Sequence, residues 1–169
     1  PLPIGFEEKE RDGGNQNVIN FHYHMKKKFS LKKSKVLLPY HTLSTNPERS
    51  NLISLLSQLP FVEIQKEKLS FTDYLSLLNN YKFVICLEGS GPDLHRNYEA
   101  LLVDSIPINI KNVISNLFDY HDVPGVFLDS WFQLNKEKYE QILNFPYNCD
   151  NIDKFLRVEH HTDLIRSLS

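Results

Sequence analysis

Residues 82–110 read KFVICLEGSGPDLHRNYEALLVDSIPINI and contain three structural signals in a row. The first is an apolar run, 82–88, which has the length of a strand and is apolar enough to be buried on both faces. A turn with two glycines follows, and residues 93–105 then carry apolar side chains at helical spacing. A second apolar run, 106–110, ends the stretch. This order predicts a βαβ unit whose two strands are parallel.

The same alternation of short apolar runs and helical segments extends along the chain on both sides of this unit. Strands that alternate with helices favour a parallel sheet with right-handed crossovers. The sequence therefore predicts an α/β fold, a Rossmann-like parallel sheet of about five strands with helices on both faces. The other predicted strands are 35–41, 61–64 and 125–129, and the other predicted helices are 46–59, 70–81, 112–120, 135–145 and 152–168.

The chain of 169 residues is long enough for one domain with a sizeable core. We interpret residues 1–34 as an interdomain linker and extension with one short element, because prolines and glycines interrupt them. Residues 35–150 form the predicted Rossmann-like domain, and residues 151–169 form a predicted C-terminal helix. The basic run 26–35 is typical of a solvated face, and contact with an acidic ligand or a lipid is the alternative.

Composition limits the classes of partner and compartment. The formal net charge is −2, so nothing global indicates binding to nucleic acid or to an anionic membrane. No apolar run is long enough for a membrane span, and no signal-peptide pattern opens the chain. Two cysteines do not make a disulfide framework and favour a cytoplasmic setting; a Golgi or ER lumen is the alternative if the full-length protein carries an anchor. Because the chain begins at Pro1 and its single methionine is Met25, we expect a piece of a longer protein.

The glycine turn between the strand 82–88 and the helix 93–105 is suited to binding an anion. Gly89, Ser90 and Gly91 allow close approach of the backbone to a ligand, and their N–H groups can form an anion-binding concavity. The free N–H groups of the following helix add to this field. In parallel sheets, ligands bind beyond the carboxyl ends of the strands, which is where this turn lies.

His95 and Arg96 stand at the start of that helix, where a cation typically costs about 0.3–1 kcal/mol. A bound phosphate reverses the sign, because arginine makes charge-assisted hydrogen bonds to phosphate oxygens. Glu99 lies one turn deeper, off the apolar stripe, and is placed to accept hydrogen bonds from ribose hydroxyls. The alternative is an ordinary turn with a solvated polar face. The incomplete Gly-x-Gly pattern disfavours a dinucleotide site of the Gly-x-Gly-x-x-Gly type.

Arg49 shows the same arrangement at a second helix start, directly after the first predicted strand. In a parallel sheet this turn opens at the same edge as the glycine turn. Two arginine-bearing helix starts at one edge suit a phosphate-containing ligand better than either does alone. A surface ion pair or simple solvation of Arg49 is the alternative.

The segment 81–109 resembles the donor-binding segment of exostosin-like glycosyltransferases and related viral and bacterial sugar transferases. Three shorter segments extend the likeness: 44–49 (STNPER) resembles the family's Thr-Asn-x-x-Arg turn, 2–5 (LPIG) the segment joining two halves, and 127–131 (FLDSW) a strand ending in Asp-x-Trp. The positions that match the family's central motif are Glu88, Gly89, Gly91, Asp93, His95, Arg96, Tyr98, Glu99, Ala100, Leu101, Ile106, Pro107 and Ile108.

The resemblance implies the C-terminal half of a GT-B glycosyltransferase, which binds a nucleotide sugar, usually UDP-linked, as its donor substrate. It implies no metal and no further cofactor. The glycan or other acceptor, and a catalytic base, would come from an N-terminal domain that this chain lacks. The residues that the resemblance assigns to the nucleotide sugar are Arg49, Gly89, Ser90, Gly91, Asp93, His95, Arg96 and Glu99.

Two departures from the family pattern lie near the proposed site. Glu88 stands where many members have proline, and residues 103–105 replace a spacer of small residues, glycine and cysteine. Two other functions therefore stay open at this point: a nucleotide-binding module without transfer activity, and a protein-interaction domain on the same scaffold. The loop 68–70 is a candidate contact for the base. The histidines at 22 and 24 and at 160 and 161 match no zinc spacing.

Overall fold

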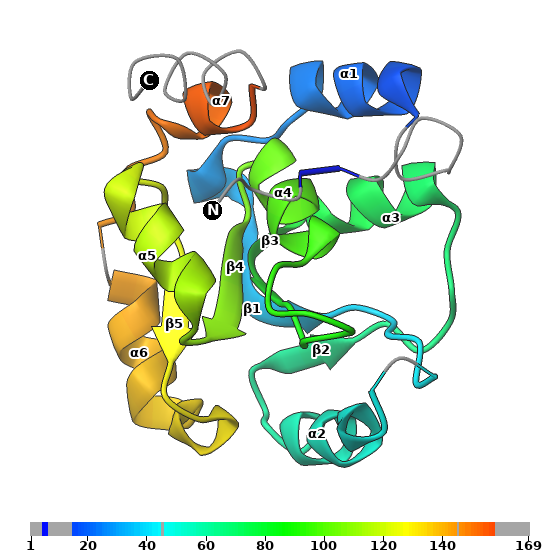
Figure 1. The fold of residues 1–169 in the computed structure, drawn as a ribbon, viewed down its shortest axis with the longest axis vertical. Helices are drawn as coiled ribbons and strands as arrows, with labels where there is room; N and C mark the ends of the chain where they lie inside the picture. Colours follow the sequence, from blue (N-terminus) through cyan, green and yellow to red (C-terminus); the bar gives the residue numbers. More distant parts are fainter. Residues whose placement is uncertain (1–4, 7–14, 45, 145, 158–169) are drawn as a thin grey trace, which may run out of the picture.

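The computed structural model describes residues 5–6, 15–44, 46–144 and 146–157. Its centre is a sheet of five parallel strands in the order β2-β1-β3-β4-β5 (Figure 1). The predicted α/β fold with a parallel sheet of about five strands is confirmed. The strands are β1 Lys33–Leu38, β2 Val62–Ile64, β3 Tyr81–Ile85, β4 Ile106–Ile110 and β5 Val126–Leu128.

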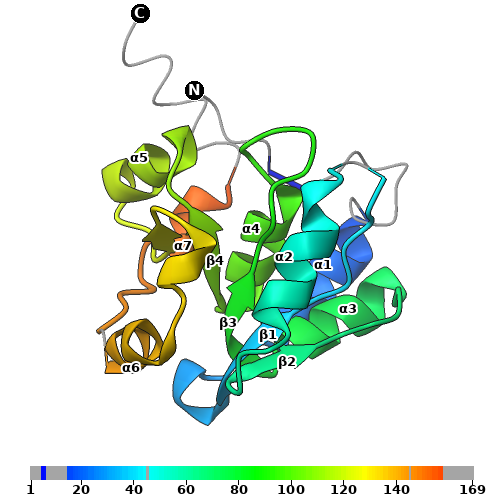
Figure 2. The ribbon, with the colours of Figure 1, turned by 90° about the horizontal axis from the view of Figure 1, so that it is seen from below.

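Helices cover both faces of the sheet, as the sequence predicts. Figure 1 places α2 and α6 in the lower half of the molecule and α1, α3 and α4 in the upper half. In Figures 1 and 2, α1 lies beside α3. The α-helices are α1 Gln16–His24, α2 Glu48–Leu56, α3 Phe71–Leu78, α4 His95–Leu102, α5 Val113–Tyr120, α6 Lys136–Asn144 and α7 Ile152–Phe155, and the 3₁₀ turns are η2 Phe29–Leu31 and η3 Trp131–Gln133.

Alternate residues of the central strands are buried on opposite faces. Val36, Phe83 and Ile108 belong to a core with side chains of α2 and α6. Leu37 and Val84 belong to a second core with side chains of α1, α3 and α4. Because both faces are covered, the strands read as continuous apolar runs, which is the pattern that the sequence shows.

Several predicted boundaries are wrong by a few residues. The predicted strand 35–41 ends at Leu38, since the next carbonyl groups bind side chains instead of a neighbouring strand. The predicted helix 93–105 begins at His95 and ends at Leu102, and Asp104 takes a positive φ of 53° that a helix cannot continue through. The predicted helix 152–168 ends at Phe155. Residues 158–169 lie outside the described part of the chain.

The segment 1–34 contains the helix α1, where the sequence predicts one short element. It also contains the turn η2. Asn15 caps α1 by accepting hydrogen bonds from the N–H groups of Asn17 and Val18. Ile19 is buried in the second core, so α1 packs as part of the domain's helical layer.

The basic run 26–35 makes many contacts within the protein. Lys26 forms ion pairs with Asp104 at 3.0 Å and with Asp153 at 3.1 Å. Lys33 pairs with Glu63 at 3.2 Å, and the Lys35 ammonium donates to the Pro60 carbonyl at 2.6 Å. The run therefore helps to hold the amino edge of the sheet, at the end opposite to the glycine turn.

Lys32 is the buried member of this run, with 4% of its surface exposed. Its ammonium donates to the Val103 carbonyl, to Ser105 Oγ at 3.1 Å and, more weakly, to Asn79 Oδ1 at 3.4 Å. These acceptors precede β3 and β4, so Lys32 joins the starts of three strands. Burial lowers the pKa of Lys32 to about 7.

Lys32 gives the domain a testable pH dependence. Its pKa falls from about 10.4 in the unfolded chain to about 7 on folding, so the unfolded chain binds more protons between these values and stability rises with pH. The free energy of unfolding should increase by about 1.5 kcal/mol from about pH 7 to about pH 8.5 through this group alone. In Lys32→Met this increase should disappear, whereas Lys28→Met, at an exposed position, should keep it. Urea denaturation at both pH values measures the difference, and equal pH dependence in Lys32→Met and the wild type would contradict the assignment.

Candidate functional site

The strand order reverses between β1 and β3. The chain builds outward from β1 to β2 on one side, then returns to place β3 on the other side of β1. The segments that leave β1 and β3 run to helices on opposite faces, α2 and α4. Open parallel sheets bind ligands at such a switch point. We call the loops that meet here, residues 39–44 and 86–94, the switch-point loops.

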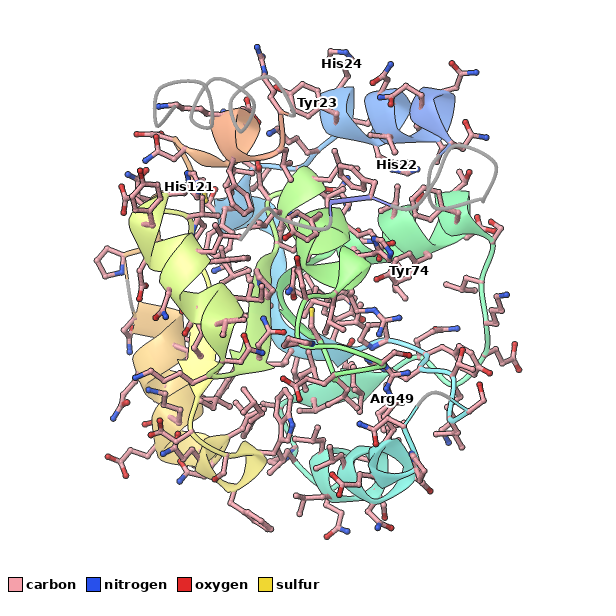
Figure 3. All side chains as sticks on the ribbon, viewed as in Figure 1. His22, Tyr23, His24, Arg49, Tyr74 and His121 are labelled. Atoms are coloured by element: carbon pink, nitrogen blue, oxygen red, sulfur yellow. The ribbon has the colours of Figure 1, made fainter. Side chains whose placement is uncertain are left out.

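Arg49 ties the two switch-point loops together from the first turn of α2 (Figure 3). Its side chain is 8% exposed. Nε donates to the Glu88 carbonyl at 2.9 Å, Nη2 to the Leu87 carbonyl at 3.0 Å, and Nη1 to the Thr42 carbonyl at 2.8 Å. The alternative of a surface ion pair or simple solvation is therefore wrong, and the structure gives Arg49 a role in shaping the site. Its predicted contact with the ligand stays a prediction.

Arg96 reaches the same place from the first turn of α4. Its Nε donates to the Tyr74 hydroxyl at 3.0 Å, and its Nη2 donates to the Tyr40 carbonyl at 3.1 Å. The guanidinium also lies 5.8 Å from the centre of the Tyr74 ring. Burial alone lowers the pKa of Arg96, but the electrostatic effects of Tyr74 and Glu99 outweigh it and raise that pKa. Arg96 therefore keeps a full positive charge at the switch point.

His41 lies in the electrostatic field of both arginines and is buried. Its Nδ1 is 2.6 Å from the Pro39 carbonyl, and its Nε2 accepts a hydrogen bond from the Leu87 N–H at 3.2 Å. Burial, followed by the positive charge of Arg96 and that of Arg49, lowers the pKa of His41 to about 2. His41 is thus a neutral link between the loops at every physiological pH.

The structure places the other predicted site residues around the start of α4. His95 Nδ1 is 2.7 Å from the Gly5 carbonyl. Asp93 accepts a hydrogen bond from the Tyr98 hydroxyl at 2.9 Å. Gly89 and Gly91 do not take the positive φ that glycine permits, since Gly5 is the one described glycine that does. A Cβ at Gly91 would have nothing within 4 Å, so the turn is open on that side.

Glu99 is buried, which the helical wheel does not predict. The wheel assumes one buried stripe, but α4 packs against the sheet, α1, α3 and α7 together. Glu99 lies close enough to Arg96 for its charge to raise the pKa of that arginine. Glu99 is therefore not part of a solvated polar face, whereas His95 and Arg96 are partly exposed. Binding of ribose by Glu99 stays a prediction.

Two buried asparagines, one in the first turn of α4 and one on β4, were not predicted. Asn97 is 1% exposed, and within the described part of the chain neither of its amide atoms has a hydrogen-bond partner. Asn109 Nδ2 likewise has no partner among the described residues. Asn109 pairs in register with Phe127, which packs against the core cluster that contains Tyr98 and Leu101 of α4, so Asn109 faces the helical layer that contains α4. Asparagine side chains carry no sequence signal that distinguishes such positions from exposed ones.

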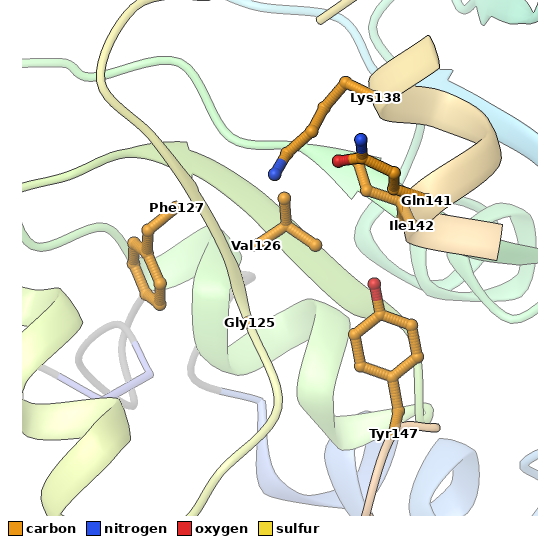
Figure 4. A pocket seen from close by; sticks show the side chains of 7 residues that line it. All are labelled: Gly125, Val126, Phe127, Lys138, Gln141, Ile142 and Tyr147. Carbon is orange, nitrogen blue, oxygen red and sulfur yellow. The ribbon is translucent and has the colours of Figure 1, made fainter. Parts of the chain in front are cut away.

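A pocket of about 240 Å³ lies elsewhere, between the edge strand β5 and α6 (Figure 4). The side chains of Lys138, Gln141 and Tyr147 extend toward the space beside Val126. No residue of the predicted site lines this pocket. Within the described residues, no cluster of potential ligands could hold a metal ion, and no helix is long and apolar enough to cross a membrane.

Comparison with known proteins assigns no family to this chain. No protein-family model matches its sequence, and no curated protein matches it significantly.

Arg49 can be tested as the link between the switch-point loops. Replacement of Arg49 by Met removes three donors and leaves buried carbonyl groups unpaired, so the free energy of unfolding should fall by about 2–4 kcal/mol. Arg49→Lys should lose most of the same stability, because one ammonium cannot reach all three carbonyls. Arg157→Met, at an exposed position, serves as the control and should change stability by less than about 0.5 kcal/mol. A loss below about 1 kcal/mol in Arg49→Met would contradict this role.

Proposed function

We propose that this domain binds a nucleotide sugar, UDP-linked, and acts as the donor-binding half of a GT-B glycosyltransferase of the exostosin-like type. The observation that carries the proposal is the meeting of two arginine-bearing helix starts at one switch point. The sugar passes to an acceptor held by a domain outside this chain. The sequence resemblance of segment 81–109 supports the same function.

Electrostatics favours an anion here. Arg49 and Arg96 are close enough for the charge of Arg96 to add to burial in lowering the pKa of Arg49. The two cations repel each other, the buried Glu99 offsets part of the charge of Arg96, and a diphosphate would neutralise the remainder. Helix α4 adds the positive end of its dipole, since Leu94 at its N-cap makes no side-chain hydrogen bond.

The unpaired asparagines also favour a polar ligand at this end of α4. A buried polar group without a partner destabilises a fold by about 1–3 kcal/mol, so such groups are rare unless they have another role. Asn97 occupies the first turn of α4, directly after Arg96. A ligand seated at the helix start can supply the missing partners for its amide.

Transfer of the sugar breaks the bond between its anomeric carbon and the β-phosphate oxygen. The electron pair of that bond goes to the departing diphosphate, while the acceptor oxygen bonds the anomeric carbon and gives its proton to a base. Positive groups at the switch point stabilise the charge on the diphosphate. Arg96 would supply this positive charge, and His95 and the N–H groups of residues 89–91 would donate hydrogen bonds to the phosphate oxygens. No residue of this chain is assigned as the catalytic base.

A nucleotide-binding module without transfer activity is the second candidate. The contacts of Arg49 favour this second candidate. Its N–H donors already bind backbone carbonyls, so Arg96 would hold most of the ligand's charge. Both candidates require nucleotide binding. Sugar transfer by the full-length protein separates them.

The first test is calorimetric titration with UDP and UDP-sugars. The wild-type domain should bind UDP, and Arg96→Ala should weaken binding about tenfold or more, because a charge-assisted hydrogen bond to phosphate is lost. Arg96→Lys should retain part of the affinity, and Arg157→Ala should bind like the wild type. Thermal denaturation of each variant separates lost affinity from lost folding, since Arg96 also contacts Tyr74 and Tyr40. No heat with any uridine nucleotide at millimolar concentration would contradict the proposal.

The second test compares two buried asparagines. Asn97→Leu removes an unpaired amide, so stability should stay the same or rise by up to about 1 kcal/mol while UDP affinity falls. Asn79→Leu is the matched control, because the Asn79 amide accepts from the Lys27 N–H at 2.8 Å and donates to the Met25 carbonyl at 3.0 Å. This control should lose about 2 kcal/mol or more of stability and keep its UDP affinity. Wild-type UDP affinity in a folded Asn97→Leu would contradict a ligand-facing role for Asn97.

A further inference from the structure

Tyr40 is an exposed aromatic residue at the centre of the site, and the proposed function does not yet use it. It is the second residue after β1, and 38% of its surface is exposed. We infer that the Tyr40 ring is the surface on which a ring of the bound nucleotide sugar stacks. This inference rests on the proposed function and adds the residue that recognises the part of the ligand beyond its phosphates.

The backbone around Tyr40 is held on both sides. Arg96 Nη2 donates to the Tyr40 carbonyl, His41 Nδ1 contacts the Pro39 carbonyl, and Arg49 Nη1 donates to the Thr42 carbonyl. His41 also binds the opposite loop through the Leu87 N–H. The ring therefore projects from a fixed loop, and stacking on it requires little ordering of the chain.

The backbone of Tyr40 contacts the charge that would hold the diphosphate. Arg96 Nη2 donates to the Tyr40 carbonyl at 3.1 Å, so the Tyr40 backbone stands at the guanidinium. The other tyrosine on Arg96, Tyr74, already uses its hydroxyl and its ring face in that contact. Tyr40 is thus the aromatic side chain at Arg96 whose ring remains exposed.

An exposed tyrosine ring recognises flat, apolar faces. The base of a nucleotide and the C–H face of a sugar both present such a face, and stacking is tolerant of the identity of the base. Phosphate alone presents none. The ring chemistry therefore predicts that Tyr40 contributes to the binding of nucleotides and nucleotide sugars and contributes nothing to the binding of inorganic pyrophosphate.

The experiment measures Kd by calorimetry for pyrophosphate, UDP and UDP-glucose with the wild-type domain, Tyr40→Ala and Tyr40→Phe. Tyr120→Ala is the matched control, since Tyr120 is 73% exposed at the end of α5. Tyr40→Ala should weaken the binding of UDP-glucose about tenfold, as loss of a stacked aromatic does, and leave the binding of pyrophosphate unchanged. Tyr40→Phe and Tyr120→Ala should match the wild type for all three ligands.

The three ligands separate the possible outcomes. If Tyr40→Ala loses affinity for both UDP and UDP-glucose, the ring stacks on the base. If it loses affinity for UDP-glucose alone, the ring stacks on the sugar. Wild-type affinity for all ligands in Tyr40→Ala, or an equal loss with pyrophosphate, overturns the inference while the proposed function stands. Failure of the wild-type domain to bind any of the three overturns the inference and the proposed function together.

Discussion

The buried guanidinium of Arg49 is the interaction on which the site depends. Its hydrogen bonds to carbonyl groups of both switch-point loops fix the segments that leave β1 and β3. Those segments lead to helices on opposite faces of the sheet, so they would otherwise separate at this edge. His41 adds a neutral link between the same loops. These two links hold the switch-point loops as a rigid frame. Arg96, from the first turn of α4, adds a hydrogen bond to the Tyr40 carbonyl within this frame.

The frame brings two guanidinium groups together at one end of the sheet. Arg49, Arg96 and the uncapped start of α4 contribute positive charge, His41 stays neutral, and the buried Glu99 offsets part of the charge of Arg96. The basic run of the sequence is used differently, in ion pairs at the amino edge. The chain as a whole has a formal net charge of −2. Local geometry therefore decides where an anion can bind, and the overall charge of the chain does not.

The sequence predicts the sheet well because its strands are buried on both faces. Such strands are continuous apolar runs, and β4 has both ends where the pattern predicts them. The parallel-sheet rule also predicts correctly that Arg49 and Arg96 meet. Their partners could not be predicted, since carbonyl groups carry no side-chain signal. The burial of Glu99 was missed because α4 is surrounded by other elements and not packed on one side only.

The central claim is that a nucleotide diphosphate binds at the switch point. The most direct measurement is a ¹H–¹⁵N NMR titration of the isotope-labelled domain with UDP. The account predicts that the largest amide shifts fall on Gly89, Gly91 and the first turn of α4, with side-chain shifts at Arg96. Shifts confined to the β5–α6 pocket around Val126, or no shifts at saturating UDP, would contradict it.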